Sequence, residues 1–343
     1  MGPGSRLRHL EDRLENLLSS DSQSPKDEAP ASIRAQVSDT ARDVVSRLAP
    51  PSPGYASRAS DMMRELYRSD YYMRQWGGLQ ARDRSDEIDD LGMDSGYAQK
   101  TLAISEFFYK HYFRVATDGV ENIPNHGPCV IVSNHSGTLP LDGLMLRAAL
   151  HREHPRRRDL RWLIEDELVK MPFLGTFMNR MGAVRACPEN ATHLLAQNQL
   201  VAVFPEGNKG SSKLFRQRYR LQRFGRGGFV RLCLKNRTPL VPCAIVGAEE
   251  SNPLLYRHQG LGRLLGLPYL PITPTFPWLG PVGLIPAPSK WKILFAERID
   301  FDDYGPDAAE DDVLVARLAE EVRGSIQRLL DTHVRDRKSV WFG

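Results

Sequence analysis

The stretch VIVSNHSGTLPLDG, residues 130–143, indicates how the centre of the chain folds. Its first part belongs to an apolar run over 129–133 that has the length and composition of a buried strand. Glycine and proline then interrupt the pattern, and an apolar segment with helical spacing begins near Asp142. A strand followed by a short loop and a helix is the repeating unit of a sheet covered by helices.

The same alternation continues toward the C-terminus. Short apolar runs predict further strands at 160–165, 182–186, 200–205, 240–247 and 291–299. Helical spacing predicts helices at 167–181, 189–198, 225–236 and within 307–333. The predicted fold class is therefore α/β, with a mixed, mostly parallel sheet flanked by helices.

The first part of the chain has a different organisation. Helical spacing recurs at 5–18, 33–48, 56–76 and 97–115, and a polar, proline-containing stretch follows the first of these segments. We expect a helical N-terminal extension with a flexible linker over 1–95 and an α/β domain over 96–335. The last residues, RKSVWFG, fit no predicted element.

Composition limits the classes of function. The formal net charge of +4 is too weakly basic to indicate a nucleic-acid partner. The four cysteines lie singly among apolar residues, which predicts buried thiols in a reducing compartment and no metal site. The N-terminus lacks the apolar core of a signal peptide, and no uninterrupted apolar run reaches the roughly 18 residues of a transmembrane helix.

His135 and Asp142 are the first candidate catalytic pair. His135 comes directly after a predicted strand, where the loops of an open α/β sheet bind ligands. A histidine there acts as a general base for a hydroxyl when a carboxylate holds its ring, and Asp142 reaches it if the intervening loop is compact. The alternative is that Asp142 only caps the next helix and that His135 is an ordinary loop residue.

A basic loop follows the predicted strand at 200–205. Between Phe204 and Gly228 the chain has seven Lys or Arg and a single acidic residue, Glu206. Glycines, backbone N–H groups and guanidinium groups at a helix start bind phosphate, and the run FGRGG predicts such a start. The alternative is a solvated basic loop.

Arg185 is a third candidate. It ends the predicted strand at 182–186 and is expected to face the same edge of the sheet as His135. Taken alone this indication is weak, because most arginines are ordinary surface residues.

Together these blocks resemble the lysophospholipid and glycerolipid acyltransferase family, which includes the lysophosphatidic acid acyltransferases. The matching motifs are NHSGTLPLD, GAVR, FPEG followed by FGRGG, and TPLVPCAIVGAEE, in this order over 118–250. The stretch TPTFPWLGPVGLIPAPSKWKILFAERID is similar to a bacterial branch of the family. The sequence departs from the family pattern in having six residues, instead of four, between His135 and Asp142, and a shortened second block ending at Arg185.

The resemblance implies an O-acyl transfer. His135 would take the proton from a hydroxyl of a lysophospholipid such as lysophosphatidic acid, with Asp142 orienting the ring. The acceptor oxygen would then attack the thioester of acyl-CoA or acyl carrier protein, the co-substrate. The resemblance implies no metal and no other cofactor.

The resemblance also assigns residues that bind the acceptor. Glu206 and Gly207 would help to form the acceptor pocket. Arg185 would hold the acceptor's phosphate, with Lys209 and Arg226 as further candidates.

Acceptors of this kind reside in bilayers, so we expect a peripheral protein at the cytoplasmic face of the membrane. Seven prolines between 268 and 288 exclude a spanning helix in the long apolar stretch near the C-terminus. This stretch is expected to form an apolar rim with Tyr269 and Trp278 at headgroup level. The alternative is that the prolines line an internal acyl groove or wrap the core.

Two other functions are open at this point. One is acyl transfer to an acceptor without phosphate, such as diacylglycerol. The other is a non-catalytic module that binds lipid or phosphate through the basic loop.

Overall fold

The computed structural model describes residues 88–136, 141–169, 174–264 and 269–342. The helices predicted at 5–18, 33–48 and 56–76 lie outside these residues. The helical extension over 1–95 and the domain boundary after it therefore stay predictions.

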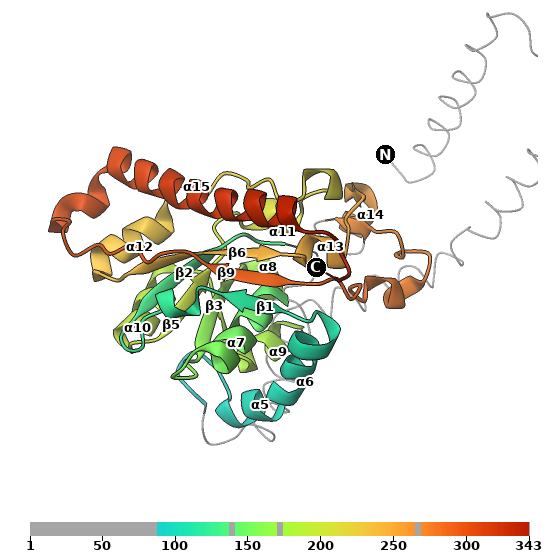
Figure 1. Ribbon diagram of the computed structural model, residues 1–343, viewed down its shortest axis with the longest axis horizontal. Helices are drawn as coiled ribbons and strands as arrows, with labels where there is room; N and C mark the ends of the chain where they lie inside the picture. The colour runs from blue at the N-terminus through green and yellow to red at the C-terminus, as the bar shows by residue number, and fades with distance from the viewer. Residues whose placement is uncertain (1–87, 137–140, 170–173, 265–268, 343) are drawn as a thin grey trace, which may run out of the picture. The chain divides into compact units, whose positions relative to one another are not determined.

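A seven-stranded sheet forms the centre of the structure, in the order β1-β9-β6-β2-β5-β3-β4 (Figure 1). The five strands from β6 to β4 are mutually parallel, β9 is antiparallel to β6, and β1 is parallel to β9. The strands are β1 (Ala116–Asp118), β2 (Cys129–Ser133), β3 (Leu160–Ile164), β4 (Ala183–Arg185), β5 (Leu200–Val203), β6 (Leu240–Val246) and β9 (Lys292–Phe295). The predicted α/β class and mostly parallel sheet are confirmed.

Strand β2 shows why these segments have continuous apolar sequences. Cys129 and Ile131 point into one hydrophobic core, while Val130 and Val132 point into the other. Successive side chains of a strand alternate between the two faces, so a sheet covered on both faces requires apolar residues at every position.

Helices cover both faces of the sheet. On one side lie α5 (Ser95–Lys100), α6 (Leu102–Phe107), the π-helix η1 (Phe108–Tyr112), α7 (Leu141–Glu153), α8 (Asp166–Val169) and α9 (Leu174–Arg180). On the other lie α10 (Pro188–Ala196), α12 (Gly228–Asn236), the 3-10 helix η5 (Pro306–Glu310) and α15 (Asp312–Asp336). In Figure 1, α12 and α15 are seen above the sheet, and α5, α6, α7 and α9 below it.

Shorter elements occupy the connections. They are the 3-10 helices η2 (Val120–Asn122), η3 (Phe215–Gln217) and η4 (Gly280–Leu284), the short helices α11 (Asn208–Ser211), α13 (Ala248–Ser251) and α14 (Gln259–Leu264), and the paired strands β7 (Tyr256–His258) and β8 (Leu270–Ile272). Strands β1, β7 and β8 are not among the predicted elements. Within the described residues, no helix has both the length and the apolar character needed to cross a bilayer.

Residues 337–342 after α15 form no helix or strand, as the sequence predicts, but they pack against the rest of the fold. The Arg337 guanidinium contacts the Glu250 carboxylate and donates to the carbonyl of Lys290 at 2.6 Å. The Lys290 N–H in turn donates to the carbonyl of Val340 at 2.9 Å. These bonds hold the segment against Glu250 and against Lys290, which lies two residues before β9.

Candidate active site

His135 and Asp142 meet at the carboxyl edge of the sheet. His135 lies two residues after the end of β2, and Asp142 lies in the first turn of α7. The His135 Nδ1 atom is 2.7 Å from Asp142 Oδ2. Because a carboxylate only accepts hydrogen bonds, Nδ1 carries the proton and Nε2 keeps a free lone pair, as a general base requires.

The Asp142 carboxylate is held in place by the segment that carries the histidine. The Ser136 N–H and hydroxyl donate to its two oxygens, each at 2.9 Å, and Asp142 is only 1% exposed. These bonds keep Asp142 next to His135 although six residues, instead of the usual four, separate them. Of the two interpretations open from the sequence, the geometry favours the pair over a simple helix cap.

An apolar pocket of about 150 Å³ opens beside the imidazole. Its lining includes His135, Trp162, Leu168, Phe204 and Gly207. The Phe204 and His135 ring centroids are 4.9 Å apart, and the His135 side chain is 13% exposed. A base that is partly open to an apolar pocket can reach a bound hydroxyl while bulk water is largely excluded.

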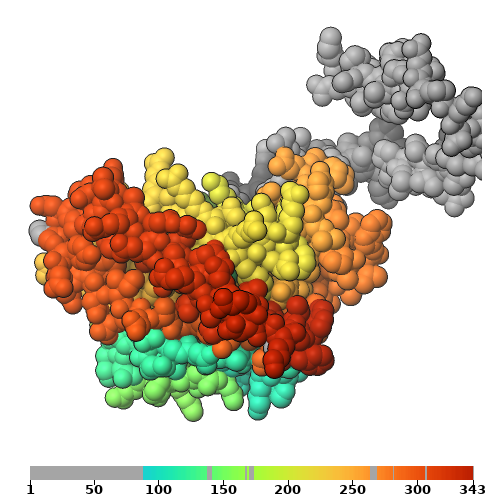
Figure 2. All heavy atoms as spheres, turned by 45° about the horizontal axis from the view of Figure 1, so that its top comes forward, coloured from blue at the N-terminus to red at the C-terminus, as the bar shows by residue number. Residues whose placement is uncertain are grey.

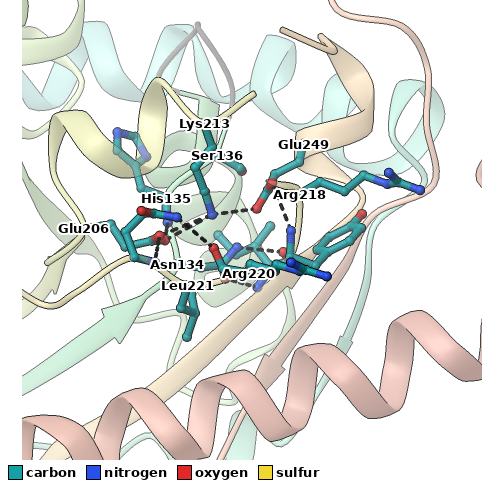
Figure 3. Close-up of polar contacts among 12 residues, drawn as sticks. Asn134, His135, Ser136, Glu206, Lys213, Arg218, Arg220, Leu221 and Glu249 are labelled. Atoms are coloured by element: carbon teal, nitrogen blue, oxygen red, sulfur yellow. Dashed lines mark hydrogen bonds and ion pairs between the residues drawn. The ribbon is translucent and has the colours of Figure 1, made fainter. Parts of the chain in front are cut away.

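Glu206 fixes the backbone of His135. Its Oε1 accepts the His135 N–H at 3.0 Å, and its Oε2 accepts the Gln222 N–H at 2.7 Å (Figure 3). Glu206 is buried and does not line the pocket, whereas Gly207 does. Among the described residues the structure places Glu206 behind the histidine, where it holds the backbone, and its part in an acceptor pocket stays a prediction.

Asn134 continues the hydrogen-bond ladder between β2 and β6 with its side chain. The amide donates to the carbonyl of Ile245 at 3.0 Å and accepts the Ile245 N–H at 2.7 Å. The main chain at His135 is thereby free to leave the sheet while the strand end stays anchored. Sequence reasoning gave Asn134 no role of its own, although it belongs to the NH motif.

A buried ionic group stands behind Glu206. The Lys213 Nζ atom lies 3.2 Å from Glu206 Oε2 and 2.9 Å from Glu249 Oε1 (Figure 3). Burial alone would lower the pKa of Lys213, but the carboxylates of Glu249 and Glu206 outweigh it and raise that pKa. Burial raises the pKa of Glu249, and the pairing with Lys213 partly offsets this.

Sequence reasoning missed the roles of Lys213 and Glu249. Lys213 lies seven residues after Glu206 in the turn after β5, and Glu249 follows β6. A basic and an acidic residue after two strands that both flank β2 were the available indication. The contacts themselves join residues 36 positions apart and depend on the fold.

Two glycines allow the turn after β5 to pack closely. Gly207 has φ +53° and ψ −145°, and a Cβ atom there would lie 2.7 Å from Glu165 Oε1. A Cβ atom on Gly210 would lie 2.6 Å from the Cβ of Glu206 and 3.0 Å from the Cβ of His135. Gly210 requires glycine for lack of space, because its neighbours are Cβ atoms, whereas Gly207 requires glycine chiefly for its backbone conformation.

The three predicted phosphate ligands do not gather at the histidine. Arg185 is exposed and makes a two-pronged ion pair with Asp166, at 2.7 and 3.0 Å, which raises the pKa of its guanidinium. Lys209 on α11 and Arg226 before α12 are exposed. Within the described residues none of the three lines the pocket beside His135, and their role in binding phosphate stays a prediction.

No group of His, Cys, Asp or Glu side chains in the described part of the chain is arranged to hold a metal ion. Cys129, Cys233 and Cys243 are buried free thiols, as predicted, whereas Cys187 is half-buried. Burial raises the pKa of Cys243 to about 12, so this thiol stays protonated and unreactive at neutral pH.

The comparisons with known proteins identify the family of the chain. The sequence profile described as "Acyltransferase" matches residues 114–246. An uncharacterized protein of Mycobacterium tuberculosis is 48% identical over 257 residues, which cover 75% of this chain and 72% of that protein. The chain belongs to the acyltransferase family. The resemblance seen in its motifs is confirmed, and the protein is an enzyme that transfers acyl groups.

Two further relatives have named activities. The 1-acyl-sn-glycerol-3-phosphate acyltransferase alpha of Ovis aries is 31% identical over 152 residues, which cover 43% of this acyltransferase and 50% of the sheep protein. The crystal structure of the 1-acyl-sn-glycerophosphate acyltransferase PlsC from Thermotoga maritima matches with a TM-score of 0.47 at 18% identity, covering 82% of this chain and 99% of that one.

All the predicted site residues of this acyltransferase, from His135 to Arg226, lie inside the segment that the family profile matches. Because the chain is an acyltransferase, the alternative of a non-catalytic binding module is not carried further.

Proposed function

We propose that this acyltransferase moves a fatty acyl group from acyl-CoA or acyl carrier protein to a hydroxyl of a lysophospholipid such as lysophosphatidic acid. The observation that carries the proposal is the 2.7 Å contact of His135 with Asp142 at the rim of an apolar pocket. The name of the sheep relative, which refers to 1-acyl-sn-glycerol-3-phosphate, supports this acceptor class. The enzyme acts as a peripheral protein at the cytoplasmic face of the membrane.

The reaction proceeds by general base catalysis. Nε2 of His135 takes the proton of the acceptor hydroxyl as the oxygen forms a bond to the thioester carbonyl carbon. The buried Asp142 carboxylate stabilises the imidazolium that forms. The tetrahedral intermediate then breaks its C–S bond, the sulfur takes the proton back from His135, and the free thiol leaves.

Replacing His135 with Ala tests this function. Transfer of a labelled acyl group from acyl-CoA to lysophosphatidic acid should fall by about 10²–10⁴-fold, which is the usual contribution of a general base. His126→Ala is the matched control, because His126 is exposed and precedes β2, at the opposite edge of the sheet. Unchanged transfer by a folded His135→Ala enzyme would remove the histidine from the mechanism.

One observation favours a second acceptor class. Arg185 is already paired with Asp166, and Lys209 and Arg226 do not line the pocket. An acceptor without phosphate, such as diacylglycerol, needs none of these cations. A panel of lysophosphatidic acid and diacylglycerol with one labelled acyl-CoA distinguishes the two classes, because only the true acceptor should give a product that depends on His135.

A further inference from the structure

A long excursion leaves the sheet beside the active site. It begins after β6 and returns as β9, and the two strands are antiparallel neighbours with Val246 opposite Lys292. Because β6 is parallel to β2, the excursion starts at the same carboxyl edge at which His135 leaves β2. It contains α13, β7, α14, β8 and η4.

This excursion concentrates exposed apolar side chains. Trp278 is 79% exposed, and three neighbours along the chain, Leu279, Val282 and Ile285, are 60–64% exposed. Further exposed large apolar residues of the excursion are Leu255, Tyr256 and Leu261. The segment is the orange part at the right of the space-filling view in Figure 2. We call residues 255–264 and 269–285 the apolar surface. So many exposed apolar side chains in one part of the chain mark an interaction site.

Beyond the buried Glu249 and Glu250 of α13, the charge of the excursion has a single sign. No Asp or Glu occurs between Glu250 and Glu297, whereas Arg257, Arg263, Lys290 and Lys292 fall in this interval. Lys292 is paired with Asp118, and Arg257 is exposed. Exposed aromatic and aliphatic side chains together with basic residues, and without acidic ones, fit the interface of an anionic bilayer.

The C-terminal segment adds to the same region. Trp341 and Phe342 are 47% and 86% exposed. An Arg114 guanidinium nitrogen donates to the carbonyls of both Pro288 and Trp341, at 2.7 and 2.6 Å, which holds the C-terminal aromatic residues beside the end of the excursion. Trp and Tyr are the residues that favour the headgroup level of a membrane.

The apolar surface is linked to His135 indirectly, through the segment that contains α11. Arg257 on β7 donates to the Ser212 hydroxyl at 3.2 Å, next to the end of α11. The Phe215 N–H donates to the carbonyl of Leu254 at 2.8 Å. On the other side, α11 packs against the histidine so closely that a Cβ atom on Gly210 would lie 3.0 Å from the Cβ of His135.

We propose that the apolar surface docks the enzyme on an anionic lipid bilayer, with Trp278, Leu279, Val282 and Ile285 entering the headgroup region and Arg257 facing lipid phosphates. The proposal deepens the proposed function and rests on it in one respect: docking brings a membrane-resident acceptor to the edge of the sheet that carries His135. Because the apolar surface contains basic but no acidic residues, we expect its partner to be a bilayer that contains negatively charged lipids.

Vesicle flotation of the full-length protein tests the proposal. The probes are phosphatidylcholine vesicles with and without phosphatidylglycerol, and the variant combines Trp278→Ser, Val282→Ser and Ile285→Ser. The vesicle affinity of the variant should fall by at least about tenfold, because the three apolar side chains that enter the interface together contribute that factor or more. The wild type should bind the anionic vesicles more tightly than the neutral ones, and salt should weaken that preference.

Val313→Ser is the matched control, since Val313 is 80% exposed on α15 and lies outside the apolar surface. It should float like the wild type. His135→Ala should also float like the wild type, because flotation measures vesicle binding and not acyl transfer. The test therefore stays valid even if His135 proves to have no catalytic role. Equal thermal unfolding midpoints of the triple variant and the wild type show that the substitutions do not disturb folding.

A triple variant that floats as well as the wild type would overturn the proposal. Two further measurements on that variant then identify the occupant. A smaller oligomer by light scattering would make the surface an interface between copies of this chain, and weaker binding of acyl carrier protein would make the occupant a protein.

Discussion

The backbone N–H of His135 donates to the side chain of Glu206 at 3.0 Å, across 71 positions of the sequence. The bond joins the turns that follow two neighbouring parallel strands, β2 and β5. The histidine is thus held at two points, with Glu206 fixing its main chain and Asp142 fixing its ring. We infer that both carboxylates affect catalysis by positioning His135, by different routes.

Glu206→Gln should lower kcat with little change in KM. The amide keeps an acceptor for the His135 N–H but removes the charge that pairs with Lys213. A small displacement of the base costs up to about 10²-fold in rate. Steady-state kinetics with Glu189→Gln, an exposed residue of α10, as the control would check this. An unchanged kcat would show that the position of His135 does not depend on Glu206.

Asp142→Asn should lower the rate of acyl transfer by about 10²–10⁴-fold. The Asn amide can donate to Nδ1 of His135, which moves the ring proton to Nε2, where it blocks general base catalysis. Single-turnover transfer from labelled acyl-CoA measures the chemical step directly. Asp303→Asn, an exposed substitution, should behave like the wild type. A fully active Asp142→Asn enzyme would show that the carboxylate does not orient the base.

Lys213→Met should destabilise the fold by about 3–5 kcal/mol at pH 8, because it leaves two buried carboxylates without a cation. Burial already raises the pKa of Glu249 in the wild type. A carboxyl whose pKa is higher in the folded than in the unfolded state stabilises the fold when protonated. The destabilisation should therefore shrink as the pH falls from 8 toward the ordinary pKa of Glu.

Urea unfolding at pH 8 and pH 5 checks the Lys213 prediction. Adding Glu249→Gln to Lys213→Met should restore part of the stability at pH 8, since it removes one unpaired charge. Lys235→Met, which breaks an exposed ion pair with Glu310, should change stability little at either pH. An equal loss at both pH values for Lys213→Met would contradict the assignment of an ionic role.

Gly210→Ala should reduce both stability and activity. The new methyl group would lie 2.6 Å from the Cβ of Glu206 and 3.0 Å from the Cβ of His135, so the backbone must shift, at a cost of about 1–3 kcal/mol. Gly228→Ala is the control, because a Cβ atom there meets no atom within 4 Å. Thermal unfolding and kcat of the two variants, measured together, check whether the close packing matters.

Arg185→Ala distinguishes the acceptor classes. If the phosphate of the acceptor takes the place of Asp166 at Arg185, the variant loses a charge-assisted hydrogen bond to the substrate. Its KM for lysophosphatidic acid should then rise by about tenfold or more. The KM for diacylglycerol should not change. An unchanged KM for lysophosphatidic acid would show that Arg185 keeps its partner Asp166 during the reaction.

The central strands could be predicted because each is buried on both faces and therefore apolar throughout, as β2 and β6 are. Strand β1 could not, because it has three residues, none of them buried, and forms only by pairing with β9. The contact between His135 and Asp142 could also be predicted, because the two residues are close in sequence. The ion pair of Arg185 with Asp166 could not be predicted, because the two side chains meet only when β3 and β4 pair side by side.

The antiparallel pairing of β6 with β9 has a consequence for evolution and engineering. The stretch from Leu255 to Ile285 lies within the connection between these adjacent strands, so its length can change without altering the register of the sheet, while Glu249 before it keeps its contact with Lys213. The segment can accordingly be exchanged among relatives as a cassette. Such chimaeras would keep the catalytic turn after β2 while acquiring a different docking face.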